Sequence, residues 1–130
     1  MNILIVDDDP IIRRILPAFC IMFSKQSTTV TAQNGEEALK ILASEQVDLI
    51  LTDVEMPVMD GCEFVTRVRE LYPKTKIIVM TGLRCDRVDK RLHDVGISRY
   101  IEKPSTAREL AKSIESVFKN RYGKAIPRAV

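Results

Sequence analysis

Five short runs of aliphatic residues recur along the chain, and each is separated from the next by a stretch with helical periodicity. The runs are rich in Ile, Val and Leu, and turn-type residues follow each of them. They cover Asn2–Val6, Thr28–Ala32, Asp48–Thr52, Lys76–Met80 and Arg99–Glu102. Short apolar runs bounded by turn residues are typical of buried strands. The alternation therefore predicts five strands, each followed by a helix.

The segments between these runs place apolar residues three or four positions apart, which is the spacing of one face of an α-helix. Asp9 followed by Pro10 has the pattern of a helix N-cap with proline at the first helical position. Pro17 lies inside the same predicted helix and lacks a backbone donor. We therefore expect either a kink at this point or a helix shifted toward its C-terminal part.

Strands that alternate with helices are joined in parallel by right-handed crossovers, with helices on both faces of the sheet. The sequence thus predicts an α/β fold with a doubly wound five-stranded parallel sheet. The expected topology is (βα)5 with strand order 2-1-3-4-5, which is flavodoxin-like. We expect residues 1–122 to form one domain and residues 123–130 to be a C-terminal tail or the start of a linker.

Composition narrows the class of protein further. The 130 residues are 45% hydrophobic and 29% charged, which suits one globular domain, and no apolar run approaches the roughly 18 residues of a membrane span. The three cysteines have no metal-type spacing, so we expect packing roles and a cytoplasmic location without membrane contact. Residues 1–65 carry 4 basic and 11 acidic side chains, whereas residues 66–130 carry 16 and 7. The basic half has no interleaved aromatics, so nucleic-acid binding through this domain is not expected.

Polar residues collect at the points where the predicted strands end. The first strand is followed by Asp7, Asp8 and Asp9, and the third by Asp53 and Glu55. Thr81 follows the fourth strand, and Lys103 follows the fifth. Because ligands of open α/β sheets bind beyond the carboxyl ends of the strands, we expect these side chains to line one site. With strands one and three as neighbours, three carboxylates gather within a few ångströms.

Three ionised carboxylates this close repel one another, so either a proton stays on the cluster or a hard divalent cation binds between them. We favour Mg²⁺. Helix capping accounts for Asp9 but not for Asp7 and Asp8 opposite Asp53. A lysine ammonium and a threonine hydroxyl at the same edge complete a set suited to in-line phosphoryl transfer to a carboxylate.

The sequence resembles the receiver domains of two-component response regulators, the family of the chemotaxis response regulator, over residues 2–121. The motifs that carry the resemblance are Ile5-Val6-Asp7-Asp8 with Arg13; Leu51-Thr52-Asp53 with Met56-Pro57 and Met59-Asp60-Gly61; Val79-Met80-Thr81-Gly82; and Tyr100-Ile101-Glu102-Lys103-Pro104. The resemblance implies that Asp53 accepts a phosphoryl group from a phosphohistidine on a histidine kinase or a histidine phosphotransfer protein. It implies that Mg²⁺ (or Mn²⁺) is ligated directly by Asp8, Asp53 and the backbone carbonyl of Glu55, and by Asp7 largely through water.

The resemblance also implies a switch. Lys103 pairs with the carboxylate and then with the phosphoryl group, while Thr81 moves toward the phosphoryl oxygens and Tyr100 turns inward. The readout surface comprises the fourth and fifth helices and the fifth strand, and the output partner or output domain is left open. A cis peptide bond between Lys103 and Pro104 is expected. Ser98 and Arg99 stand where many receivers have an acidic residue that supports dimers, so we expect a monomer or a weak dimer.

Two other readings differ in chemistry. Asp7 and Asp9 also fit the DxD pattern of phosphatases of the haloacid-dehalogenase type, but Pro10-Ile11 follows where that family has Gly-Thr-like residues. A pure interaction module of the same fold would lack some of the acidic, lysine or threonine positions, and all of them are present. The expected protein is a signalling phosphoacceptor with its own self-phosphorylation and autodephosphorylation chemistry, not a conventional enzyme. Phosphomonoester turnover would favour a phosphatase, whereas stoichiometric labelling of Asp53 would favour a receiver.

Overall fold

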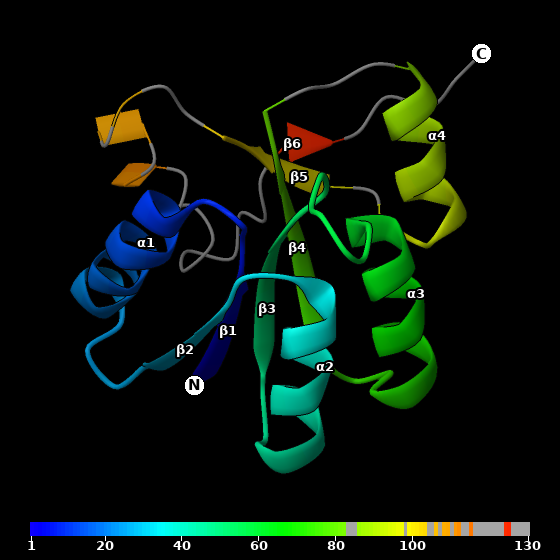
Figure 1. The fold of residues 1–130 in the computed structure, drawn as a ribbon. Helices are drawn as coiled ribbons and strands as arrows, with labels where there is room; N and C mark the ends of the chain where they lie inside the picture. The colour runs from blue at the N-terminus through cyan, green and yellow to red at the C-terminus, as the bar shows by residue number, and fades with distance from the viewer. Residues whose placement is uncertain are drawn as a thin grey trace.

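A parallel sheet forms the centre of the protein in a computed structural model that describes residues 1–82, 86–97, 99–103, 106, 108–109, 111–112, 115 and 124–125. Five parallel strands lie in the order β2-β1-β3-β4-β5. Their bounds are β1 Asn2–Val6, β2 Thr28–Ala32, β3 Leu49–Asp53, β4 Lys76–Thr81 and β5 Arg99–Glu102. The predicted strand order is confirmed, and Figure 1 shows the strands side by side.

A sixth strand differs from the prediction. β6 (Lys124–Ala125) pairs antiparallel with β5, so that Arg99 lies opposite Ala125 and Tyr100 opposite Lys124. The sequence analysis assigned these residues to a tail or linker, because two residues are too short to produce a periodic pattern. The physical reason for the pairing is that β5 ends the parallel sheet, and its outer edge offers backbone groups that need partners.

Helices cover both faces of the sheet, with α1 (Pro10–Phe23) on one side and α2 (Gly35–Ser44) and α3 (Gly61–Leu71) on the other (Figure 1). α4 (Asp86–Asp94) follows β4. In the predicted fifth helix the described residues Arg108, Glu109, Ala111, Lys112 and Glu115 are helical, whereas Pro104 and its expected cis bond lie outside the described residues. Among the helices that the structure describes, none combines the length and the apolar character needed to cross a bilayer.

α1 begins where its cap predicts, not further along. The Asp9 side chain accepts a hydrogen bond from the Ile11 amide at 2.9 Å, and the helix runs through Pro17 to Phe23. The predicted shift toward the C-terminal part of this segment is therefore wrong. The cap satisfies an amide of the first turn, and the buried side chains of Leu16 and Cys20 hold the helix on the sheet on both sides of the proline.

The sheet separates two apolar clusters because successive side chains of a strand point to opposite faces. On β1, Ile3 and Ile5 pack in the cluster that includes Leu16 of α1, whereas Leu4 and Val6 belong to the cluster with Phe64 of α3. Every residue of β3 is buried, as expected for a central parallel strand covered on both faces.

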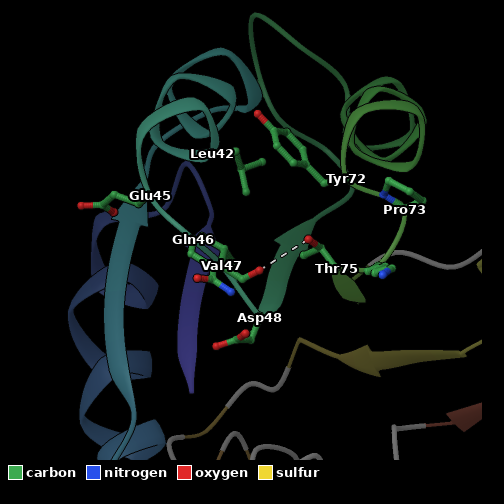
Figure 2. Close-up of a pocket in the computed structure, with 9 residues that line it drawn as sticks. Leu42, Glu45, Gln46, Val47, Asp48, Tyr72, Pro73 and Thr75 are labelled. Atoms are coloured by element: carbon green, nitrogen blue, oxygen red, sulfur yellow. Dashed lines mark hydrogen bonds between the residues drawn. The ribbon is translucent and has the colours of Figure 1, made fainter.

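A recess of about 600 Å³ lies at the amino ends of β3 and β4, between the ends of α2 and α3 (Figure 2). Leu42, Val47 and Tyr72 contribute apolar walls, and the Thr75 hydroxyl donates to the Val47 carbonyl at 3.4 Å. This is the edge of the sheet opposite the one at which Asp7 and Asp53 lie. The recess is therefore separate from the polar cluster at the carboxyl ends.

Gly61 allows α3 to start directly against the end of β3. A Cβ atom at this position would lie 2.4 Å from the carbonyl oxygen of Asp53 and 2.7 Å from the Cα of Val54. The Gly61 amide donates to the Val54 carbonyl at 2.8 Å, which fixes this close approach. No side chain larger than hydrogen fits here without movement of the backbone.

Gly61→Ala should lower the free energy of unfolding by about 1–3 kcal/mol, because the added methyl group meets backbone atoms rather than a flexible side chain. Gly82→Ala is the matched control, since among the described residues its Cβ would meet only the Cβ of Lys103 at 3.6 Å, an ordinary contact. Urea denaturation of both variants measures the difference. Equal stabilities would show that the backbone at Asp53 yields freely.

Candidate functional site

Three carboxylates meet at the carboxyl ends of β1 and β3. Asp7 and Asp8 follow β1, and Asp53 is the last residue of β3, which lies beside β1 with Thr52 opposite Val6. One carboxylate oxygen from each lies within 4.8 Å of the others. Asp7 is 0% and Asp53 is 5% exposed, whereas Asp8 is exposed. The strand order thus brings together the carboxylates that the sequence analysis expected to meet.

Lys103 reaches this cluster from the end of β5. Its Nζ lies 2.8 Å from Asp53 Oδ2 and 3.0 Å from Asp7 Oδ2. The backbone places the side chain, because the Lys103 amide donates to the Thr81 carbonyl at 2.9 Å and so continues the pairing of β4 with β5. One ammonium group therefore bridges Asp7 and Asp53, which are 46 positions apart in the sequence. Lys103 itself lies 50 positions after Asp53.

Burial determines the electrostatics of the cluster. Desolvation raises the pKa of both Asp7 and Asp53, and the neighbouring carboxylate raises each further, while Lys103 acts in the opposite direction. Burial by itself lowers the pKa of Lys103, but hydrogen bonds from Lys103 to Asp53 and Asp7 raise it overall. Lys103 is thus held in its charged form, and a single ammonium does not balance three carboxylates.

The oxygen atoms of the cluster suit a hard divalent cation. Asp7 Oδ1 accepts from the Asp9 amide at 2.9 Å and from Lys103 at 3.2 Å, whereas the buried Asp7 Oδ2 makes no hydrogen bond, since its contact with Nζ is outside hydrogen-bonding geometry. Asp53 Oδ1 accepts from the Val54 amide at 2.7 Å. A buried carboxylate oxygen that accepts no hydrogen bond, beside two further carboxylates, is the donor set that Mg²⁺ binds. The residues therefore fit the metal.

Glu55 lies at the edge of this cluster. Its amide is 3.4 Å from Asp53 Oδ1, and its side chain is exposed. The participation of its carbonyl as a metal ligand remains a prediction.

The two predicted switch residues lie on neighbouring strands. Thr81 ends β4 and is 3% exposed, and Tyr100 of β5 is 2% exposed and opposite Val79. The aromatic ring belongs to the apolar cluster on the α3 side of the sheet. The sequence analysis expected Tyr100 to turn inward after phosphorylation, but in this structure the ring is already inside. Movement of the Tyr100 ring after phosphorylation remains a prediction, and that movement would start from this buried position.

Two contacts near the cluster were not predicted. Arg91 of α4 donates from Nη2 to Asp60 Oδ1 at 2.7 Å. The two residues are 31 positions apart, so nothing local in the sequence signals this pair. Arg13 Nη1 donates to the Asp7 carbonyl at 2.8 Å, which attaches α1 to the end of β1.

Val58 is strained as well as exposed. Its φ is 71°, a left-handed conformation that β-branched residues rarely adopt, and its exposed fraction is 74%. It lies in the loop between Asp53 and α3. Ile11, in the first turn of α1 after the acidic run, is 63% exposed. Apolar side chains are therefore displayed in both segments that follow the acidic residues.

Known proteins are similar to this chain in both sequence and fold. The family model described as the response regulator receiver domain matches residues 3–115. The chain is 38% identical over 119 residues to the probable transcriptional regulator ycf27 of Cyanidium caldarium, covering 91% of this chain and 46% of that protein. It is 35% identical over 109 residues to the autoinducer 1 sensor kinase/phosphatase LuxN of Vibrio campbellii, covering 84% of this chain and 12% of LuxN.

Solved structures agree with these relatives. The chemotaxis protein CheY4 of Vibrio cholerae is 31% identical, with a TM-score of 0.75 and coverage of 89% of this chain and 97% of CheY4. A CheY-like receiver domain protein from Methanospirillum hungatei JF-1 is 28% identical, with a TM-score of 0.75 and coverage of 92% and 94%. The chain spans between 12% and 56% of the length of the curated relatives compared. With its acidic cluster and its strand order, the chain belongs to the response regulator receiver domain family.

Proposed function

We propose that this domain accepts a phosphoryl group on Asp53 and passes the change to a protein-interaction surface. The observation that carries the proposal is the pairing of the Asp53 carboxylate with Lys103 at 2.8 Å beside the Asp7 and Asp8 carboxylates. A carboxylate nucleophile next to a fixed cation is the arrangement that in-line phosphoryl transfer requires. The unit that performs this chemistry is residues 1–122, and of the segment 123–130 that follows, Lys124 and Ala125 add the short strand β6 to its sheet.

In the proposed reaction an Asp53 carboxylate oxygen attacks the phosphorus of a phosphohistidine. The new P–O bond forms as the P–N bond breaks, and the electron pair of that bond stays on the departing imidazole. Lys103 then neutralises charge on the phosphoryl oxygens while it remains anchored to Thr81 through its backbone amide. Asp8, Asp53 and the backbone carbonyl of Glu55 would hold Mg²⁺ (or Mn²⁺) directly, and Asp7 largely through water. The ion would supply further positive charge to the phosphoryl oxygens.

The donor in this proposal is a protein, either a histidine kinase or a histidine phosphotransfer protein. Ile11 and Val58 support this choice, because exposed apolar side chains beside a charged pocket suit a macromolecular surface better than a small metabolite. The similarity to a segment of LuxN, a sensor kinase/phosphatase by name, is consistent with such a pathway. An output partner or an output domain reads the change at Thr81 and Tyr100.

Asp53→Asn should abolish labelling by acetyl phosphate, because the amide cannot act as the nucleophile. Intact-mass spectrometry of the wild type with Mg²⁺ should show one added phosphoryl group, and the variant should show none. Asp48→Asn is the control, since this exposed carboxylate lies at the opposite end of β3. Equal labelling of the Asp53 variant would refute the proposed acceptor, and catalytic turnover of a phosphomonoester would favour a phosphatase instead.

Mg²⁺ should stabilise the wild-type protein, by about 1.4 kcal/mol at a free concentration tenfold above its Kd. Asp8→Ala should weaken this effect more than Asp7→Ala, because Asp8 is the direct ligand and Asp7 acts largely through water. Urea denaturation with and without Mg²⁺ measures both, and Glu45→Gln, exposed at the other edge of the sheet, is the control. A larger loss in the Asp7 variant would reverse the assignment of the two ligands.

Thr81→Ala should leave labelling of Asp53 in place but reduce the response of Tyr100 to a beryllofluoride mimic of the phosphoryl group. The hydroxyl is the group expected to follow the phosphoryl oxygens, so Thr81→Ser should retain the response. NMR spectra of the Tyr100 ring and amide, with saturating Mg²⁺, report the effect. A full response in the alanine variant would exclude the hydroxyl from the switch.

A further inference from the structure

An ion pair joins α4 to the loop that follows the proposed phosphoacceptor. Arg91 Nη2 lies 2.7 Å from Asp60 Oδ1, with side-chain exposures of 42% and 36%. The hydrogen bond to Asp60 raises the pKa of Arg91, so the guanidinium is charged. Exposed ion pairs contribute little to stability. This pair is of interest because it connects α4 with the loop between β3 and α3.

Asp60 is firmly attached to the end of β3. The oxygen that binds Arg91 also accepts the Cys62 amide at 2.7 Å, so Asp60 is the N-cap of α3. The next residue, Gly61, donates to the Val54 carbonyl and lies so close to Asp53 that a Cβ would be 2.4 Å from its carbonyl oxygen. Gly61 is in direct contact with the Asp53–Val54 backbone, with no space between them. A shift of that backbone must therefore move the adjacent residue, Asp60.

Modification of Asp53 would act on this backbone directly. Asp53 Oδ1 accepts the Val54 amide at 2.7 Å, and Oδ2 pairs with Lys103. Converting the carboxylate to an acyl phosphate changes both interactions. A resulting shift of the Val54 backbone would reach Asp60 through the contact between Gly61 and Val54.

α4 is attached to the site at two points. Its first residue, Asp86, comes five positions after Thr81, and Arg91 lies in its second half. Val88 and Leu92 are buried against the sheet, whereas Arg87 and Lys90 are exposed. Thr81 and Arg91 therefore connect the same helix to the two strand ends, β4 and β3, that border the acidic cluster.

We propose that the Arg91–Asp60 ion pair is a latch that makes α4 follow the β3–α3 loop when Asp53 is phosphorylated. This inference rests on the proposed function and adds a second route to it, independent of Thr81 and Tyr100. Arg91 is a positioning residue: it acts through Asp60 and does not touch the phosphoryl group. A guanidinium suits this role, because it is always charged and its Nη2 donates directly to Asp60 Oδ1.

The test compares the responses of the pocket and of α4 to beryllofluoride with saturating Mg²⁺, read as NMR amide shifts. In Arg91→Gln the pocket amides should respond as in the wild type, while the shifts across residues 86–94 should fall about threefold or more, since the mechanical connection is lost. Asp60→Asn, which keeps an N-cap side chain, should have the same effect. The α4 response of the double variant should be no smaller than that of either single variant, since both substitutions break the same ion pair.

Arg67→Gln is the matched control. It breaks the Arg67–Glu63 ion pair of 3.2 Å, which has similar exposure but joins two residues of one helix, so the α4 response should be unchanged. Arg91→Lys keeps the charge and should restore part of the response. Should Asp60→Asn reduce the folded fraction, the comparison of Arg91→Gln with Arg91→Lys still decides the question.

The outcomes separate the two proposals. Pocket amides of the wild type that do not respond to beryllofluoride would overturn the proposed function. A normal pocket response with an undiminished α4 response in Arg91→Gln would overturn the latch alone. A joint loss in Arg91→Gln and Asp60→Asn, with Arg67→Gln unaffected, would support it.

Discussion

Two buried carboxylates, Asp7 and Asp53, share one ammonium group at the carboxyl edge of the sheet, and the rest of the site depends on this imbalance. Burial raises the pKa of each carboxyl, the charge of Asp8 raises that of Asp7 and the charge of Asp7 raises that of Asp53, while Lys103 limits the rise. Asp8 adds a third carboxylate at the surface of the cluster. The fold therefore holds a pocket that is short of positive charge, and it favours whatever supplies that charge. This physical demand links the metal and the phosphoryl chemistry of the family to the same few atoms.

The backbone of the sheet makes such a cluster possible. β1 and β3 are adjacent and fully buried along most of their length, so their ends are held at fixed separation. Pairing of β4 with β5 brings Lys103 to the carboxylates through an amide contact with Thr81. On the far side, Gly61 lets α3 begin against Asp53 itself. A change of charge at Asp53 consequently acts on rigid neighbours, which suits a switch better than a mobile loop would.

The surroundings of the cluster are relevant to both the proposed phosphoryl donor and the proposed output partner. Exposed Ile11 and Val58 lie in the segments that follow the acidic residues, and the left-handed backbone of Val58 indicates that the loop is held at some cost in strain. Arg91 connects the same loop to α4. A donor that contacts the loop and a reader that contacts α4 would thus be coupled through Asp60.

Much of the fold and of the candidate site could be predicted from the sequence. The alternation of apolar runs and helical periods predicted five parallel strands and their order, because burial on both faces requires continuous aliphatic residues. The polar residues after each strand predicted the meeting of Asp7, Asp8 and Asp53, since parallel strands end at one edge. The Asp9 cap of α1 could be predicted because its hydrogen bond is local.

Only the tertiary structure decided the remaining features, and each of them depends on contacts between residues distant in sequence. The Arg91–Asp60 pair spans 31 positions, and nothing near either residue signals the other. β6 is two residues long and exists because β5 has an open edge. The continuation of α1 through Pro17 and the inward position of Tyr100 likewise depend on packing. A sequence determines local geometry and burial through its own periodicity, whereas a contact across the fold depends on where other elements lie.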